Sequence, residues 1–287
     1  MVIVQLSGGL GNQMFEYALY LRLKAEGRQV KIDDSTCYGH EGERPLQLGR
    51  VFGVIYDRAL EEEIRRMTDS FPDPVSRIRR KLLGRKNLSY READVNFDPE
   101  VLKREPVLLE GCFQSERYFA PVADQVREAY RFRKERLHLT EQAEVLAERI
   151  SDSPAVSVHV RRGDYLDASH GGMYTGICTE GYYQKAMERI RKSVPDAVFY
   201  VFSNDTDWAK AHFAGKDCVV AEGGTEDTGY QDMYLMSLCQ HHIIANSSFS
   251  WWGAWLGRNP EKKVIAPDRW LNGTECRDIY TENMIRI

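Results

Sequence analysis

The sequence predicts an α/β fold in which each half of the chain forms a parallel sheet with helices on both faces. Apolar runs of strand length alternate with segments of helix length, which is the pattern of parallel sheets. The chain opens on a strand, a glycine-rich turn, a helix and a second strand, the order of a βαβ unit. A length of 287 residues suits about two domains. A polar Ser-Asp-Ser-Pro segment has the composition of a linker and sets the predicted domains at residues 1–153 and 154–287.

The first half begins with a strand at residues 2–6 and the turn SGGLGNQ. Met14, Tyr17 and Ala18 then recur at the spacing of one helical face, and Gly27 ends that helix. The other elements predicted in this half are a strand at 30–33, a charged helix at 59–67, a strand at 107–110 and a helix at 139–150.

The second half repeats the alternation. Its first strand, at residues 155–160, begins with the apolar run Ala-Val-Ser-Val and predicts a buried position in the sheet. The elements predicted after it are a helix at 179–193, a strand at 197–202, a short strand at 219–221, a helix at 232–239, a strand at 242–245 and a last strand at 263–266.

Composition narrows the function. The net charge of −4 argues against nucleic acid as the main partner. No apolar run approaches the ~20 residues of a membrane span, and the opening MVIVQL fits a first strand rather than a signal peptide. The six cysteines are scattered without a C-x-x-C pair, which favours reduced thiols in a cytoplasmic protein over metal or redox chemistry.

A basic stretch lies at residues 76–91, with seven Lys or Arg residues and no acidic one. The favoured interpretation is a solvated helix and loop, because charge runs are usually solvated. The alternative is a peripheral contact with an anionic membrane surface.

The run HVRRGDY at residues 159–165 carries the strongest functional signal. It follows the predicted strand at 155–160, and ligands of open parallel sheets bind at the carboxyl ends of strands. Strand alternation puts His159 and Arg161 on one side, with Asp164 in the loop beyond. An arginine fork matches phosphate oxygens two at a time, so the run suits an anionic ligand. The alternative is a surface pair of arginines bridged to Asp164.

The glycine-rich turn leaves two alternatives open. Gly9 and Gly11 match the start of a dinucleotide fingerprint, with Asp33 at the distance of a ribose contact, which would suit a nicotinamide-dependent oxidoreductase. However, Met14 stands where the third glycine belongs. Asn12 sits at the mouth of the turn and could contact phosphate or sugar, or could cap the helix.

Two further strand ends are polar. In SNDTDW, Asp205 and Asp207 have the spacing of a metal-binding pair, but we assign them to a turn and helix cap and expect no metal. In ANSSFSWWGAWL, the serines could donate to a phosphate at a helix start or could cap that helix. Trp251, Trp252 and Trp255 could line a sugar or base site or could pack in the core with the following helix, and for Trp255 we favour the core. Glu16 faces a ligand cleft or is a solvated acid of the first turn.

Together these segments resemble one family. GGLGNQMFEYA, GCFQSERYF, HVRRGDY, YVFSNDTDW, QDMYLMSLCQHHIIANSSFSWWGAWL and VIAPDRWL, in this order, look like bacterial α-1,2-fucosyltransferases over nearly the whole chain. The resemblance implies two Rossmann-like domains of the type called GT-B, facing each other across a cleft. It implies that residues 1–153 bind the acceptor and residues 154–287 bind GDP-fucose, with inversion at the fucose and no required cofactor or metal.

Site roles follow from the resemblance. Arg161 resembles the arginine that holds the donor β-phosphate, His159 would contact the nucleotide, and Gly11 and Asn12 would reach the donor from the first domain. Further donor contacts are implied for Ser203, Asn204 and Asp205, for Ser247, Ser248 and Phe249, and for Asp232. This sequence departs from the family pattern at Glu16, at Cys112 and in the insert at 167–176. These departures bear on which acceptor the protein would use.

The expected reaction moves L-fucose from GDP-fucose to the 2-hydroxyl of a terminal β-galactoside on an oligosaccharide. Asp164 is the expected catalytic base, because it follows Arg161 in one loop; its alternative role is to orient Arg161 or Arg162 through a salt bridge. Besides the oxidoreductase, the remaining alternative is a protein that binds a nucleotide sugar without catalysis.

Overall fold

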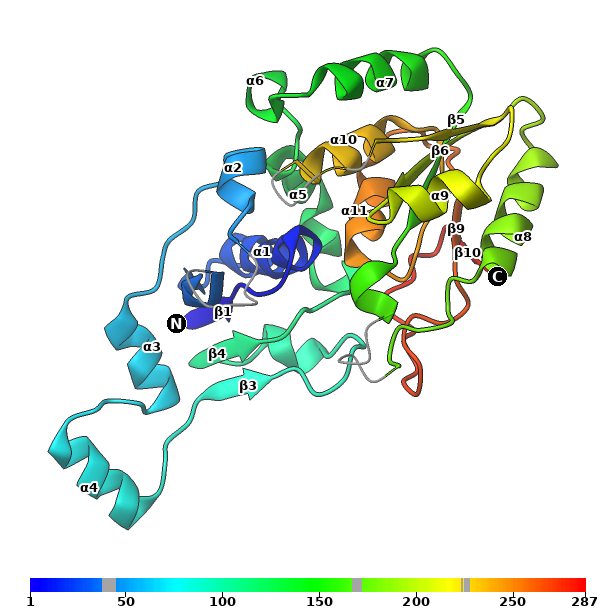
Figure 1. The fold of residues 1–287 in the computed structure, drawn as a ribbon. Helices are drawn as coiled ribbons and strands as arrows, with labels where there is room; N and C mark the ends of the chain where they lie inside the picture. The colour runs from blue at the N-terminus through cyan, green and yellow to red at the C-terminus, as the bar shows by residue number, and fades with distance from the viewer. Residues whose placement is uncertain (38–44, 167–171, 223, 225–227) are drawn as a thin grey trace. The chain divides into compact units, whose positions relative to one another are not determined.

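The computed structural model describes residues 1–37, 45–166, 172–222, 224 and 228–287. The chain divides into two compact units, Met1–Arg131 and Phe132–Ile287, each built on its own sheet (Figure 1). Every paired strand in both sheets runs parallel to its neighbour, so the predicted α/β class with parallel sheets is confirmed. None of the helices in these described ranges is long and apolar enough to cross a membrane.

The first unit contains a four-stranded sheet in the order β2-β1-β4-β3. Its strands are β1 (Val2–Gln5), β2 (Val30–Asp33), β3 (Ser89–Arg91) and β4 (Val107–Glu110). Its α-helices are α1 (Leu10–Ala25), α2 (Leu48–Phe52), α3 (Glu61–Thr68), α4 (Pro74–Leu83) and α5 (Ala123–Ala129). Its 3₁₀ turns are η1 (Ser35–Cys37), η2 (Pro99–Leu102), η3 (Glu116–Tyr118) and η4 (Ala120–Val122).

Strand β1 is central in this sheet, and Val2, Ile3 and Val4 are all fully buried. Such a strand, buried on both faces, is typical of parallel sheets covered by helices. Helix α1 follows it and ends where Gly27 takes a left-handed conformation (φ 76°), as the sequence predicts.

The second unit contains a six-stranded sheet in the order β10-β9-β8-β5-β6-β7. Its strands are β5 (Ala155–Val160), β6 (Val198–Ser203), β7 (Cys218–Val220), β8 (His241–Ile243), β9 (Val264–Ala266) and β10 (Met284–Arg286). Its helices are α6 (Lys134–Leu137), α7 (Glu141–Ser151), the 3₁₀ turn η5 (Gly163–Leu166), α8 (Glu180–Arg191), α9 (Thr206–His212), α10 (Tyr230–Leu238) and α11 (Ser248–Leu256).

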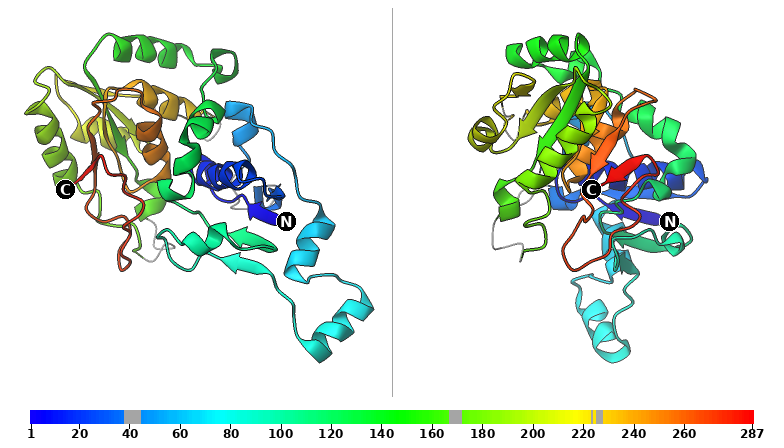
Figure 2. Two further views of the ribbon diagram at one scale, coloured as in Figure 1. Left: turned by 180° about the vertical axis from the view of Figure 1, so that it is seen from behind. Right: turned by 90° about the vertical axis from the view of Figure 1, so that its right-hand side faces the viewer.

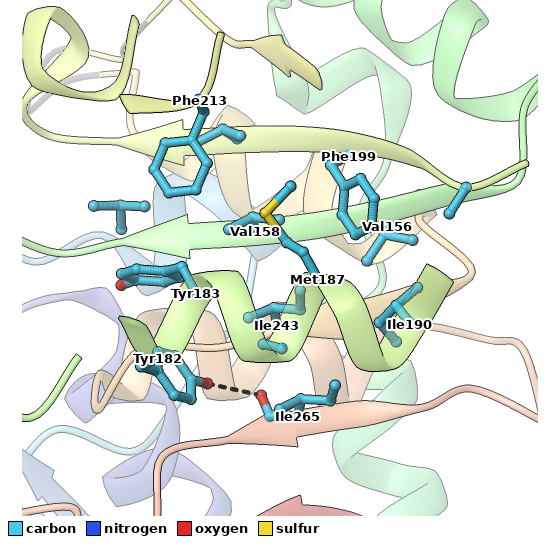
Figure 3. Packing of buried hydrophobic residues seen from close by; sticks show 14 of the residues in the cluster. Val156, Val158, Tyr182, Tyr183, Met187, Ile190, Phe199, Phe213, Ile243 and Ile265 are labelled. Carbon is cyan, nitrogen blue, oxygen red and sulfur yellow. Dashed lines mark hydrogen bonds between the residues drawn. The ribbon is translucent and has the colours of Figure 1, made fainter. Parts of the chain in front are cut away.

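The alternation of side chains along β5 separates the two faces of this sheet. Val156 and Val158 point into a core that α8 closes with Tyr183 and Met187 (Figure 3). Further views show α8 and α11 on opposite sides of the sheet (Figure 2). His159 belongs to the α11 side, where its ring lies 5.6 Å from that of Phe249. Strand parity therefore aims the polar residues of β5 away from its apolar core.

The elements predicted from the sequence all occur in the structure, which adds the short helices α2, α5 and α6 and two strands. Strands β3 and β10 were not predicted, and each lies at an edge of its sheet. Each has three residues and ends in an exposed arginine. An edge strand of this kind lacks the continuous apolar run that marks a buried one.

The division of the chain into two units falls between Arg131 and Phe132, ahead of the polar segment at 151–154. Helix α7 packs on α10, and the Phe132 ring lies 5.4 Å from that of Tyr234. The Tyr230 hydroxyl also donates to the Leu137 carbonyl at 2.6 Å. These contacts attach residues 132–153 to the second unit. The boundary predicted at residue 153 rests on linker composition, which carries no information about packing between segments that are distant in the sequence.

Tyr182 ties α8 to two neighbouring strand ends, since its buried hydroxyl donates to the carbonyls of Ile244 and Ile265 at 2.6 and 3.2 Å (Figure 3). We expect Tyr182→Phe to lower the free energy of unfolding by about 1–2 kcal/mol, because buried acceptors lose a donor. Urea denaturation measures this. Tyr234→Phe is the matched control, and equal losses in the two variants would contradict the assignment.

Candidate functional site

The ends of β5 and β6 are joined by a network of hydrogen bonds around Arg162. Val160 pairs with Ser203, so the loops after both strands start side by side. The Arg162 amide donates to Asn204 Oδ1 at 2.9 Å, and Asn204 Nδ2 donates back to the Arg162 carbonyl at 3.3 Å. Gly163 turns away with a left-handed φ of 56°, and a Cβ there would lie 2.8 Å from Asn204 Nδ2. The backbone at residue 163 therefore takes a conformation that favours glycine.

The Arg162 side chain is also held in place. Its Nε donates to Asp205 Oδ2 at 3.1 Å, and its guanidinium lies 4.2 Å from the centre of the Trp208 ring. Asp205 in turn caps α9 by accepting from the Trp208 amide at 3.1 Å. Arg162 thus forms a salt bridge with Asp205.

The predicted donor contacts at the end of β6 have local partners. The Ser203 hydroxyl bonds to the amide and carbonyl of Asp205 at 3.0 and 3.2 Å. Together with the Arg162 bonds, this gives Ser203, Asn204 and Asp205 a role in shaping the strand end. Whether they also touch a nucleotide stays a prediction.

The Asp205–Asp207 pair has the geometry of a helix start. Asp205 is the N-cap of α9 and Asp207 is exposed in its first turn. Across the described ranges, no cluster of three or more His, Cys, Asp or Glu side chains could hold a metal ion.

His159 is buried and uncharged at neutral pH. Burial, followed by the charge of Arg161, lowers the pKa of His159 to about 3. Its Nδ1 atom is buried and has no hydrogen-bond partner in the described structure. A neutral imidazole with an unused nitrogen can donate or accept one hydrogen bond to a ligand.

Arg161 lies just past β5 and is partly exposed. Its guanidinium lies 5.6 Å from the centre of the Tyr165 ring. Tyr165 is itself fixed, because its hydroxyl donates to the Asn246 carbonyl at 3.0 Å and its ring stacks on Tyr174 at 4.5 Å. The charge of Arg161 also contributes to the lowered pKa of His159.

Residues 247–249 form the start of α11. Ser247 is the N-cap residue, but its side chain makes no capping bond. Asn246, buried before it, donates to the Trp270 carbonyl at 3.0 Å, which fixes the chain entering the helix. The Phe249 ring contacts His159. A helix N-terminus carries partial positive charge and binds anions, so this turn suits the phosphate role predicted for Ser247, Ser248 and Phe249.

The tryptophans of α11 belong to the core. Trp251 and Trp252 are fully buried and stack edge to face at 4.9 Å, and Trp251 Nε1 donates to the Ile279 carbonyl at 2.7 Å. The prediction that they line a sugar or base site is wrong, because no surface of either ring is left for a ligand. The core position predicted for Trp255 is confirmed.

Asp232 lies in the first turn of α10, and burial raises the pKa of its carboxyl to about 7. Asp164 lies in the η5 turn directly after Arg162 and Gly163, but its side chain is outside the described residues. Its predicted role as base, or as a partner of Arg161, therefore stays a prediction.

Asn12 is placed by the first unit's glycine turn. Gly8 has a left-handed φ of 66°, and a Cβ there would lie 2.7 Å from Asn12 Nδ2. Asn12 does not cap α1, since Gly9 occupies that position. Instead its amide donates to Cys112 Sγ at 3.3 Å and accepts from Gln114 Nε2 at 2.9 Å. Gly11 is buried beside it in the first helical turn.

Two buried carboxyls lie close to Cys112, and both contribute to a raised pKa of its thiol after burial itself. Glu16 accepts from the amide and hydroxyl of Ser7 at 2.8 and 2.7 Å, so its interpretation as a solvated acid is wrong. Glu92 accepts from the amides of Cys112 and Phe113 at 2.8 and 3.1 Å. Burial raises the pKa of both carboxyls. Glu92 lies in no motif, so sequence reasoning missed it.

The alternative ribose contact at Asp33 is not favoured by its surroundings. Its buried carboxylate accepts from Gln5 Nε2 at 3.2 Å and from the Ser35 amide at 3.0 Å. Both bonds hold the turn after β2.

Comparisons with known proteins agree on one family. A family model described as glycosyl transferase family 11 matches residues 101–285. The chain is 30% identical to the O-antigen biosynthesis glycosyltransferase WbnK of Escherichia coli, covering 98% of this chain and 99% of WbnK. It is 32% identical to an α-1,2-colitosyltransferase of Escherichia coli, covering 100% and 98%. It is also 32% identical to galactoside α-(1,2)-fucosyltransferase 1 of Rattus norvegicus, covering 52% and 41%.

The raised pKa of Asp232 predicts a pH-dependent stability. The folded chain keeps a proton that the unfolded chain releases above about pH 4, so this contribution is present at low pH and lost as the pH rises through about 7. We expect Asp232→Asn to gain stability over the wild type by about 1 kcal/mol or more between pH 5 and pH 8. Urea denaturation at both pH values measures it, with exposed Asp207→Asn as control. Parallel pH dependence of wild type and Asp232→Asn would refute the buried neutral carboxyl.

Proposed function

Because this chain belongs to glycosyltransferase family 11, we propose that it transfers L-fucose from GDP-fucose to the 2-hydroxyl of a terminal β-galactoside, with inversion. The family assignment confirms the resemblance drawn from the motifs and displaces the oxidoreductase alternative. The observation that carries the donor assignment is Arg161 beside an uncharged, buried His159 whose ring contacts the first turn of α11. A rat relative named as a galactoside α-1,2-fucosyltransferase supports the linkage and acceptor.

The diphosphate is assigned to Arg161 and the start of α11. Arg162 is engaged by Asn204, Asp205 and Trp208, and the partly exposed Arg161 lies just past β5 with its guanidinium 5.6 Å from the centre of the Tyr165 ring. A guanidinium fork and a helix N-terminus both favour phosphate oxygens. Held in place before reaction, they stabilise the negative charge that develops on departing GDP.

His159 contributes a hydrogen bond rather than a charge. Its low pKa keeps the imidazole neutral at any physiological pH, and Nδ1 is unused. The Tyr183 hydroxyl fixes the backbone by donating to the His159 carbonyl at 3.0 Å. We assign to this nitrogen the nucleotide contact that the family resemblance implies.

Asn12 contributes from the first unit. Cys112 and Gln114 hold its side-chain amide from both sides, so its orientation is set before any ligand binds. We assign it a contact with the donor sugar or phosphate, and we assign the acceptor to this unit.

The proton of the acceptor hydroxyl goes to Asp164 in this proposal. Inversion requires the hydroxyl to attack the face opposite GDP, and a carboxylate is a suitable base for it. Glu16 is a poorer candidate, because it is buried and both its oxygens accept from Ser7.

A second candidate is α-1,2 transfer of colitose. The full-length match to an α-1,2-colitosyltransferase is as strong as any fucosyltransferase match at 32% identity. The two candidates share the linkage and differ in the donor sugar.

The deciding experiment incubates the protein with GDP-fucose or with a colitosyl donor and a panel of galactosides. Mass spectrometry scores transfer, and NMR reads the linkage and anomeric configuration. We expect fucosylation at the 2-hydroxyl with inversion, undiminished by excess EDTA. Loss of activity in EDTA that magnesium restores would overturn metal independence. Binding of GDP-fucose with no transfer to any acceptor would favour a non-catalytic binder.

Arg161→Lys tests the phosphate role. Lysine keeps the charge but loses the bidentate fork, so kcat should fall about a hundredfold or more. Steady-state kinetics measures it, with Arg191→Lys, a surface arginine paired with Asp217, as control. Retention of about a third of wild-type kcat by Arg161→Lys would remove Arg161 from the mechanism.

Asp164→Asn separates a base from an orienting group. If Asp164 is the base, GDP affinity stays within a few-fold of wild type while the single-turnover rate falls about a hundredfold or more. If it orients Arg161, GDP affinity falls as well, because a charge-assisted contact is lost. Calorimetry and rapid quench on the one variant measure both quantities. Near-normal turnover would eliminate both roles.

A further inference from the structure

Helix α4 presents its apolar side chains to solvent, while its Arg79 and Arg80 side chains contact the protein. Val75, Ile78 and Leu82 are 76%, 60% and 76% exposed, and Leu83 beside them is 75% exposed. They recur at the spacing of one helical face. Surface helices of globular domains normally bury that face. This reversed polarity requires a partner for the apolar stripe.

The inward side of α4 is anchored by polar contacts. Arg79 forms an ion pair with Asp69, the residue that ends α3. Arg80 donates to the carbonyls of Asp69 and Phe71 at 3.2 and 2.8 Å. The Lys86 backbone amide donates to Asp69 Oδ2 at 2.9 Å. These contacts fix the orientation of α4 on its unit and leave the stripe exposed.

Positive charge borders the stripe. Arg77 and Lys81 lie on the helix beside it, and Lys86 follows in the next turn of chain. None of these three side chains has an ion pair or hydrogen bond within the described ranges. Residues 74–91 contain no acidic side chain to neutralise them. Figure 1 shows α4 at the far end of its unit, beyond α3.

We propose that α4 is a membrane-surface anchor that lies on a bilayer of anionic lipids. An amphipathic helix with basic residues beside an apolar face inserts that face at the boundary between headgroups and acyl chains. Lys and Arg stems run along the apolar layer while their charges reach the headgroups. Anionic lipids attract such a cluster, and the attraction is screened by salt.

The positive charge beside the stripe favours an anionic membrane over two other binding partners. A second copy docking through the same face would bring two uncompensated basic surfaces together, which is unfavourable. A single-stranded nucleic acid would use aromatic side chains for stacking, and the stripe has none. The inference does not rest on the proposed transfer reaction.

The test is co-sedimentation of the full-length protein with vesicles of phosphatidylcholine, alone or mixed with phosphatidylglycerol. We expect binding to the anionic vesicles only, and release at high salt. A stripe variant, Val75→Ser with Ile78→Ser and Leu82→Ser, should lose about tenfold or more in partitioning. A charge variant, Arg77→Gln with Lys81→Gln and Lys86→Gln, should lose as much.

Matched controls carry the same changes elsewhere. Val145→Ser removes an exposed apolar side chain from α7, and Lys185→Gln with Arg189→Gln and Lys192→Gln removes three exposed charges around α8. Both controls should bind as wild type does, and circular dichroism should show all variants folded. Absence of wild-type binding to anionic vesicles, or binding by the stripe or charge variant that equals wild-type binding, overturns the proposal. So does sedimentation showing a wild-type oligomer that the stripe variant dissociates, since that identifies a second copy as the occupant.

Discussion

The geometry of the second unit depends on the bonds that join the ends of β5 and β6. Asn204 closes a pair of hydrogen bonds with the Arg162 backbone, and Asp205 holds the Arg162 side chain while capping α9. These contacts fix the Arg162 guanidinium in a structural role, while the charge of the adjacent Arg161 acts on His159 and lowers its pKa.

Burial then sets the electrostatics of this region. His159 lies in the sheet against Phe249, where loss of water outweighs any gain from ionising, and the neighbouring Arg161 opposes a second positive charge. A neutral imidazole beside a guanidinium and a helix N-terminus is an arrangement that favours anions. The fully buried Trp251 and Trp252 fix α11 within the core and so hold its N-terminus in place.

The first unit uses buried polar groups differently. Glu16 holds Ser7, and Glu92 holds the backbone of Cys112 and Phe113, so two carboxyls fix the segments on either side of Asn12. In the same unit, α4 is held by its polar side and turns its apolar side outward. Both arrangements place polar groups inside and stabilise them with hydrogen bonds. The bonding is incomplete in each, since Glu92 Oε1 and Arg79 Nη1 are buried without a hydrogen-bond partner in the described structure.

The sequence by itself determined the fold class, most of the strands and helices, and the family. Buried parallel strands are continuous apolar runs, and glycines end helices where a left-handed conformation is needed. Both features can therefore be predicted from the local sequence. The motif at 159–165 likewise predicted a functional strand end, since alternation along a strand is fixed by the backbone.

Tertiary structure decided what each polar side chain does. Asn12, Asn204 and Asp205 have their partners far away in sequence or across a strand pair, so neither a cap nor a contact could be assigned from spacing alone. Glu92 carries no motif, and its burial arises only when β3 and β4 come together. The sequence did not predict edge strands β3 and β10 or the exposed apolar stripe of α4, for one physical reason. The local pattern shows which residues are apolar, whereas their exposure depends on what packs against them.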